Sequence, residues 1–261
     1  MKKSSIFYVK LKLLQFLNII IAVVGFYLAY KYDKLNLLWV SFAVLMYQTL
    51  NAVCFLHRFF AHRSFKVSKW IEIVASISVI FAAFGSTIAW VAVHRVHHKE
   101  TDKPGDPHSP YVNHNVNKKL SLWKAFKIWI LFLDKSKIPY KYTKPLSDQP
   151  FHVFLHKQYF KIVLTTYTIL GIIDPWLVVF IFAIPACFLM FSLGSLASLG
   201  HIHGYKTYEL DNEARNSWIV SIFTLGDGWH NNHHAKPNKW TTQEKWWEFD
   251  PAGWLIWLIK K

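Results

Sequence analysis

Long apolar stretches dominate the pattern of hydrophobic and polar positions. The segments 12–30 and 36–56 are almost wholly apolar, and the region 159–198 is apolar for long enough to cross a bilayer twice, with Asp174-Pro175 as its natural turn. A helix needs about 20 apolar residues to span the hydrocarbon core of a membrane. The pattern predicts an all-α integral membrane protein with four spans, at about 12–30, 36–56, 159–173 and 176–198.

A fifth apolar stretch, Ile71–Val93, differs from the four spans because polar residues interrupt it. These residues are Glu72, Ser76, Ser78, Gly85, Ser86 and Thr87. Such a stretch fits either a further span or a helix that lies along the membrane surface. Its hydropathy alone does not separate these alternatives.

The charge of the chain changes what its composition means. The chain has 261 residues, of which 53% are hydrophobic, and a net charge of +15. In a soluble protein such a charge would suggest a nucleic-acid partner. In a membrane protein, Lys and Arg instead gather on cytoplasmic loops. The outer loops of the four-span topology, 31–35 and the turn at Asp174, hold no positive excess. We therefore expect both termini in the cytoplasm and no nucleic-acid partner.

Eight histidines fall in three tight groups at the ends of apolar stretches: His57 and His62; His94, His97 and His98; His230, His233 and His234. Imidazole is a ligand suited to iron, zinc and copper. The four-span topology puts all three groups on the cytoplasmic side, whereas a span at 71–93 would separate the second group from the first. The hypothesis of a shared metal site therefore favours the interpretation of 71–93 as an interfacial helix.

The spacing within the groups predicts their geometry. In each H-x-x-H-H motif, positions i, i+3 and i+4 share one face of a helix, so we expect the three imidazoles to project together. His57 and His62 are five residues apart, which leaves them about 140° from each other on an ideal α-helix. That pair is expected to straddle the cytoplasmic end of the second span.

The identity of the metal follows from the ligand types. The two cysteines, Cys54 and Cys187, form no C-x-x-C pair, so an iron–sulfur cluster is excluded. Two closed zinc sites would leave no position for chemistry, whereas two non-haem irons would leave positions open for oxygen. The alternative, a histidine-rich metal-handling membrane protein, predicts ionisable residues along the spans, and the predicted spans contain almost none.

These motifs resemble those of the membrane fatty acid desaturase family, in its acyl-CoA/acyl-lipid delta-9 branch. The resemblance runs from His57 to Pro251 and covers most of the chain. It rests on the first box at 57–62, the second at 90–98 with its flank at 99–110, the third at 226–234, and the tail at 246–251. Together these motifs are very specific.

The resemblance implies a single domain over 1–261, with four spans and a cytoplasmic helical cap at 94–158 and 199–261. It implies an enzyme that uses O2 and external electrons to introduce a cis double bond, at the delta-9 position, into a saturated acyl chain. Two irons would be held by nine histidines: His57, His62, His94, His97, His98, His201, His230, His233 and His234. His201 supplies the ninth ligand, and Ala197 replaces an Asn that holds one iron through water in the family.

Further residues receive roles from their positions. Asp106 and Asp227 are expected to orient imidazoles through the second ring nitrogen; Asp102 fits this role or that of a helix cap equally well. Trp90, one turn before His94, is expected to line the acyl tunnel.

The expected partners are an acyl substrate with an acidic head group (CoA, phospholipid or acyl carrier protein), the membrane, and a separate electron-donor protein. Arg58 and Arg95 either contact that head group or carry cytoplasmic positive charge. The alternatives on the same iron site are an acyl hydroxylase, an acetylenase or an acyl-carrier-protein desaturase. An inactive homologue is a further alternative, supported only by Ala197.

Overall fold

The computed structural model describes residues 2–112, 115–119 and 140–261, so part of the predicted cap lies outside the described residues. Within these ranges the regular elements are helices, apart from one antiparallel strand pair, β1 (Tyr111–Val112) and β2 (Asn115–Lys119), and two isolated bridges, Tyr205–Asn216 and Asn216–Trp229. The all-α prediction is confirmed, with this short hairpin as an addition.

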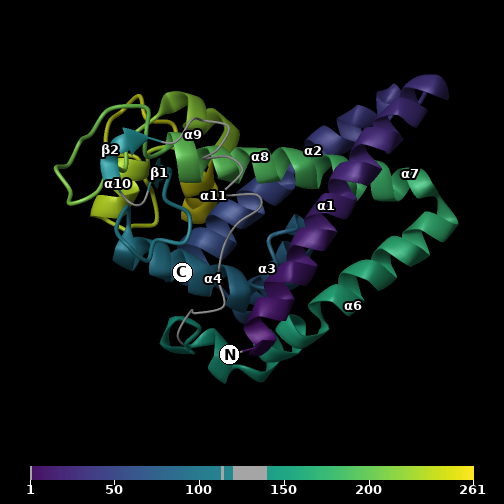
Figure 1. Cartoon of the computed structure of the whole chain (residues 1–261), viewed down its shortest axis with the longest axis horizontal. Helices are drawn as coiled ribbons and strands as arrows, with labels where there is room; N and C mark the ends of the chain where they lie inside the picture. Colours follow the sequence, from purple (N-terminus) through teal and green to yellow (C-terminus); the bar gives the residue numbers. More distant parts are fainter. Residues whose placement is uncertain (1, 113–114, 120–139) are drawn as a thin grey trace.

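Four helical segments are the longest elements of the molecule (Figure 1). The first is α1, and the second is α2 continued by the π-helix η2; a short turn, η1, joins them. The third is α6, and the fourth runs through α7, the π-helix η7 and α8. Their bounds are α1 Lys2–Lys31, η1 Leu35–Leu37, α2 Leu38–Asn51, η2 Ala52–Ala61, α6 Pro150–Ile173, α7 Pro175–Leu177, η7 Val178–Ala183 and α8 Ile184–Leu199.

Three segments are long and apolar enough to span a membrane: Ile6–Lys31, Leu35–Ala61 and Pro175–Leu199. They coincide with three of the four predicted spans. The fourth prediction, 159–173, lies within the longer helix α6, which begins at Pro150 and is not among these segments. The number of spans therefore stays a prediction.

The prediction that 71–93 forms one interfacial helix is wrong, because this stretch is not a single helix. The chain forms α3 (Lys69–Ser78), a short turn η3 (Val79–Ala82) and then α4 (Thr87–Glu100), with a bend of 81° between the two halves. Ala83 and Gly85 both adopt positive φ values, 60° and 88°, which an α-helix cannot accommodate. Ser86 then starts α4 as its N-cap by accepting a hydrogen bond from the Ala89 amide.

Side chains from α1 cover this break. Gln15 Nε2 donates to the carbonyl of Ala83 at 2.9 Å, and the Tyr8 hydroxyl donates to the carbonyl of Ala89 at 3.1 Å. Carbonyl groups away from water need such partners. The N-terminal half of α1 thus holds the bent pair in place and fixes the direction of α4.

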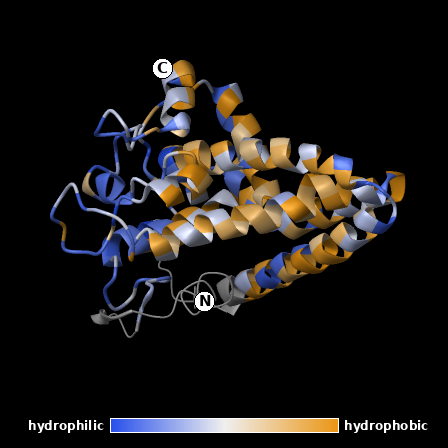
Figure 2. Cartoon of the chain, turned by 90° about the horizontal axis from the view of Figure 1, so that it is seen from above, coloured by the Kyte–Doolittle hydropathy of each residue, from blue (hydrophilic) through white to orange (hydrophobic). Residues whose placement is uncertain are grey.

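The remaining elements gather at one end of the long helices. They are η5 (Tyr140–Tyr142), η6 (Leu146–Asp148), α9 (Trp218–Thr224), α10 (His230–Ala235) and α11 (Pro251–Ile259). Figure 2 shows hydrophobic residues along the long helices and hydrophilic residues concentrated at this end. Many large apolar side chains of α1 face outward, Leu13 and Val23 among them. Outward apolar surface on long helices is what a lipid environment requires.

Candidate metal centre

The π-helix η2 determines how the first histidine pair is arranged. The amide of His62 donates to the carbonyl of His57 at 3.2 Å, an i→i+5 hydrogen bond. This pattern stacks residues five apart one turn above each other, and the two imidazole rings lie 5.0 Å apart between centroids. The predicted separation of about 140° is wrong, because it assumed α-helical geometry.

The nine predicted histidines converge in two groups, within each of which the ligand nitrogens all lie within 4.8 Å of one another. The five-histidine group consists of His57, His62, His94, His98 and His233. The four-histidine group consists of His97, His201, His230 and His234. The groups are adjacent, since the rings of His98 and His234 stack at 4.3 Å.

Each H-x-x-H-H motif is divided between the two groups. On α4, His94 and His98 belong to the five-histidine group and His97 belongs to the four-histidine group. On α10 the division is reversed, since His233 alone joins the five-histidine group. Residues i and i+4 lie above each other on a helix, while i+3 is displaced to the side. The three imidazoles of each motif were predicted to project together from one face of the helix. In the structure they are shared between two neighbouring groups.

Nitrogen–nitrogen distances test whether these groups fit metal ions. The Nε2 atoms of His62 and His94 lie 2.7 Å apart, and those of His57 and His233 lie 2.9 Å apart. In the four-histidine group, His230 Nε2 lies 3.0 Å from His234 Nε2. Two nitrogens at about 2.1 Å from one ion lie about 3.0 Å apart at a right angle and about 3.4 Å apart at a tetrahedral angle. The short separations bring these nitrogens to the distance at which neighbouring ligands of one ion lie.

Three carboxylates hold the second ring nitrogen of three of these histidines. His57 Nδ1 lies 2.5 Å from Asp227 Oδ2, and His97 Nδ1 lies 3.0 Å from Asp106 Oδ1. His201 Nδ1 lies 3.0 Å from Asp102 Oδ2. With Nδ1 engaged, Nε2 of each ring faces its group, and in the case of His97 this buried atom has no hydrogen-bond partner. Such carboxylate–histidine pairs are typical of metal sites.

The electrostatics of these carboxylates favour their charged form. Burial raises the pKa of Asp227, but the neighbouring His57 and Arg58 outweigh it and hold the pKa below its usual value. Burial likewise opposes the ionisation of Asp106, and His97 overcomes it to lower the pKa of that group well below its usual range. The acids are therefore hydrogen-bond acceptors for the imidazoles at neutral pH.

Several buried polar residues of the centre were not found from the sequence. Asn232, between two ligands of α10, donates from Nδ2 to Glu248 Oε2 at 2.9 Å and accepts from Asn216 Nδ2 at 2.7 Å. Glu248 is fully buried and also accepts the amides of Glu244 and Lys245. These contacts fix α10 against the tail of the chain. The position of Asn232 inside a histidine motif and that of Glu248 in the tail at 246–251 are the signals that could have found them.

The two arginines considered for a head group are occupied otherwise. Arg58 is fully buried and forms ion pairs with Asp227 and Asp250. Arg95 donates to the backbone carbonyls of Phe60 and Ala61 at 3.1 Å each. Of the two alternatives for Arg58, contact with a head group is wrong, because its side chain lies inside the protein.

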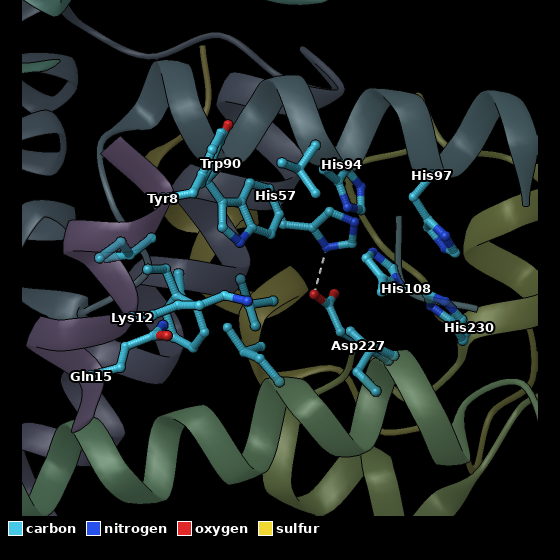
Figure 3. A pocket seen from close by; sticks show the side chains of 18 residues that line it. Tyr8, Lys12, Gln15, His57, Trp90, His94, His97, His108, Asp227 and His230 are labelled. Carbon is cyan, nitrogen blue, oxygen red and sulfur yellow. Dashed lines mark hydrogen bonds and ion pairs between the residues drawn. The ribbon is translucent and has the colours of Figure 1, made fainter. Parts of the chain in front are cut away.

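A cavity runs along the centre between α1, α4 and α8 (Figure 3). Trp90 lines it, with its ring stacked on His94 at 4.7 Å. Ala197 lines it as well, together with His97 and His230. The next residue, Ser198, donates its hydroxyl to the Gly194 carbonyl at 2.8 Å.

The histidines left outside the predicted ligand set lie in different surroundings. His203 is exposed. His108 lies beside His97, with ring centroids 4.2 Å apart, and forms a further small cluster with His97 and Asp106. His152 is buried and contacts Thr87, and His156 contacts Ser86.

Comparison with known proteins gives the family. Residues 35–256 match the family model described as fatty acid desaturase. The chain is 34% identical over 210 residues to the sn-2 palmitoyl-lipid 9-desaturase of Nostoc sp.. The aligned region covers 78% of this chain and 71% of that protein.

Two further relatives carry related names. The sn-1 stearoyl-lipid 9-desaturase of Synechocystis sp. is 34% identical, with 78% of this chain and 61% of that protein covered. The Delta-9 acyl-lipid desaturase 2 of Arabidopsis thaliana is 32% identical, with 88% and 73% covered. The chain thus spans about three fifths to three quarters of the length of these relatives. It belongs to the fatty acid desaturase family.

Proposed function

We propose that this protein introduces a cis double bond at the delta-9 position of a saturated acyl chain carried by a membrane lipid. As a member of the desaturase family, it is an oxidoreductase that acts on fatty acyl chains. The named relatives are 9-desaturases of acyl lipids, which favours this position and this substrate class. The observation that carries the proposal is the cavity whose wall includes Trp90 and residues of both histidine groups.

The cofactor in this proposal is a pair of iron ions, one in each histidine group. The five-histidine group has one ligand more than a closed tetrahedral zinc site uses, which favours iron over structural zinc. When bound, the irons and O2 supply the oxidising power that removal of hydrogen from an unactivated methylene requires. A separate protein supplies the electrons.

The chain's own residues orient and enclose the reaction. Asp227, Asp106 and Asp102 accept hydrogen bonds from imidazole Nδ1 atoms and so keep Nε2 directed at the ions. The cavity is lined by the polar residues Tyr8, Lys12 and Gln15 of α1 and by six apolar side chains: Ala52, Val53, Phe84, Val93, Leu193 and Leu196. An extended acyl chain fits such walls.

The proposal includes a topology with four spans and the centre in the cytoplasm. The second helical segment ends at Ala61, four residues past His57, and α8 ends just before His201. If both of these ends are cytoplasmic, the chain crosses the bilayer once more between them. α6 packs against α4 at its first turn, where His152 contacts Thr87, and its last residue adjoins α7. Its 24 residues extend about 36 Å, enough to cross. The bent pair α3–α4 then stays on the cytoplasmic side.

Gas chromatography–mass spectrometry of lipids from a host that expresses the chain tests the activity. We expect new delta-9 monounsaturated acyl chains with the natural protein and none with a His233→Ala variant produced at the same level. Iron-loaded protein that yields no unsaturated product from any acyl donor would refute the proposal.

Labelling of single cysteines tests the topology. In a background without Cys54 and Cys187, cysteines at Ser68 and Lys103 should both react with an impermeant reagent from the cytoplasmic side only. Opposite accessibility of these two positions would mean that α3 and α4 together cross the membrane.

A further inference from the structure

Arg58 lies at the centre of a buried network of charges behind the five-histidine group. Its side chain is fully buried. Nε and Nη2 donate to Asp227 Oδ1 at 3.1 and 2.8 Å, while Nη1 and Nη2 donate to the two oxygens of Asp250 at 2.8 and 2.9 Å. Nη1 also donates to the carbonyl of Trp240 at 3.1 Å. The fixed fork of a guanidinium suits two carboxylates held in this way.

Each of these two carboxylates accepts further hydrogen bonds. Asp227 accepts from His57 Nδ1 through its other oxygen, at 2.5 Å. Asp250 accepts the amide of Gly253 at 2.9 Å and so caps α11, and it accepts the amide of Thr242 at 2.9 Å. A continuous set of contacts thus leads from a histidine of the five-histidine group through Arg58 to the C-terminal helix.

The four-histidine group is supported differently. Asp106, behind His97, accepts the backbone amides of Asp102 and His108 at 2.8 and 3.0 Å. Asp102, behind His201, accepts the amide of Glu213 at 2.9 Å. Within the part of the chain that the structure describes, no ion pair with Lys or Arg is formed by either of these acids. Only one of the two groups therefore depends on an arginine.

We propose that Arg58 is a positioning residue that holds Asp227 against His57 and thereby fixes the imidazole for the ion of the five-histidine group. The inference rests on the two-ion site proposed above. Asp227 and Asp250 are buried negative charges that require a compensating cation, and only a planar fork reaches both with two donors each. Lysine keeps the charge but loses this geometry, so Arg58→Lys isolates the positioning role from the charge.

The test compares Arg58→Lys with Arg95→Lys, a matched control in which the arginine contacts backbone carbonyls rather than carboxylates. Each protein is purified in full length and titrated with ferrous iron, and iron binding is followed by metal analysis and Mössbauer spectroscopy. We expect Arg58→Lys to bind one of two ions about 10- to 100-fold more weakly, with the other unchanged. Arg95→Lys should bind both ions as the natural protein does.

A further variant, Asp250→Asn, changes a partner of Arg58 that contacts neither His57 nor Asp227. It should weaken binding of the same ion to a smaller extent. In the double variant Arg58→Lys/Asp227→Asn, the loss should not exceed that of Asp227→Asn alone, because Arg58 acts through Asp227. Two tightly bound ions with unchanged spectra in Arg58→Lys would overturn the inference, as would an equal loss of both ions. If the natural protein binds no iron, the proposed function fails instead.

Discussion

The five-histidine and four-histidine groups are neighbours, yet the protein builds them in different ways. The first draws ligands from η2, α4 and α10, and an arginine that bridges to α11 supports it. The second draws ligands from α4, α10 and the segment after α8, and backbone amides of the loops around Asp102 and Asp106 support it. A buried arginine supports the acid of one group, while backbone amides support the acids of the other, and one of these amides, that of Glu213, is 111 residues from Asp102.

The groups also differ in the number of nitrogen ligands. Five imidazoles converge in one and four in the other. Ala197, a side chain without any donor or acceptor, lines the cavity next to two members of the four-histidine group, His97 and His230. With one imidazole fewer, the four-histidine group is expected to hold its ion less tightly.

The largest effect is expected from removal of a ligand of the weaker group. His97→Ala should abolish desaturation, because it leaves three imidazoles for one ion, while the five-histidine ion is retained. The loss should appear in turnover more than in binding of the acyl substrate, since the other residues that line the cavity are unchanged. Product analysis and metal analysis of the purified variant measure this.

His203→Ala is the control for that variant, since His203 is an exposed histidine near the same ligands. It should retain both ions and full activity. If His97→Ala still turns over substrate at the natural rate, the four-histidine group has no part in the reaction.

A smaller effect is expected from the supporting carboxylates, and it separates the two groups. Asp227→Asn should weaken the ion of the five-histidine group and Asp106→Asn that of the four-histidine group, each by about 10- to 100-fold. The amide keeps the size of the side chain but accepts a weaker hydrogen bond from imidazole Nδ1. Iron titration followed by spectroscopy distinguishes the two ions.

The comparison would break down if both substitutions weakened the same ion. In that case the division of nine histidines into groups of five and four would not describe the metal-bound protein.

The smallest effect is expected at Ala197. Ala197→Asn introduces an oxygen toward the four-histidine group and should strengthen binding of its ion by a few-fold, with activity preserved or raised. Ala197→Leu adds a similar volume without a donor atom and should not strengthen binding. Competition with an iron chelator gives the affinities, and lipid analysis gives the activity.

One outcome of this experiment would reverse the functional conclusion. If the natural protein binds iron but yields no product, and Ala197→Asn gains desaturase activity, then the natural chain is a silenced member of its family.

The sequence by itself determined the apolar segments and the set of clustered histidines. Three predicted spans coincide with long apolar helices of the structure. The hydropathy of a segment depends only on its own residues, so it can be calculated without knowledge of the fold. The nine histidines were found from spacing and family resemblance, since ligand types and motif spacing are visible without any fold. Asp106 and Asp227 were named from the same motifs, although the sequence did not show which imidazole each contacts.

Only the tertiary structure decided how these residues are combined. The π-helical turn that aligns His57 with His62 depends on an i→i+5 hydrogen bond that no residue pattern indicated. Which group each histidine of an H-x-x-H-H motif joins depends on where the fold places η2, His62 and His201 beside α4 and α10. Arg58 resembled a surface charge in the sequence and is buried because Asp227 and Asp250, 169 and 192 residues away, meet it in the fold. Such contacts join distant segments, so local pattern carries no information about them.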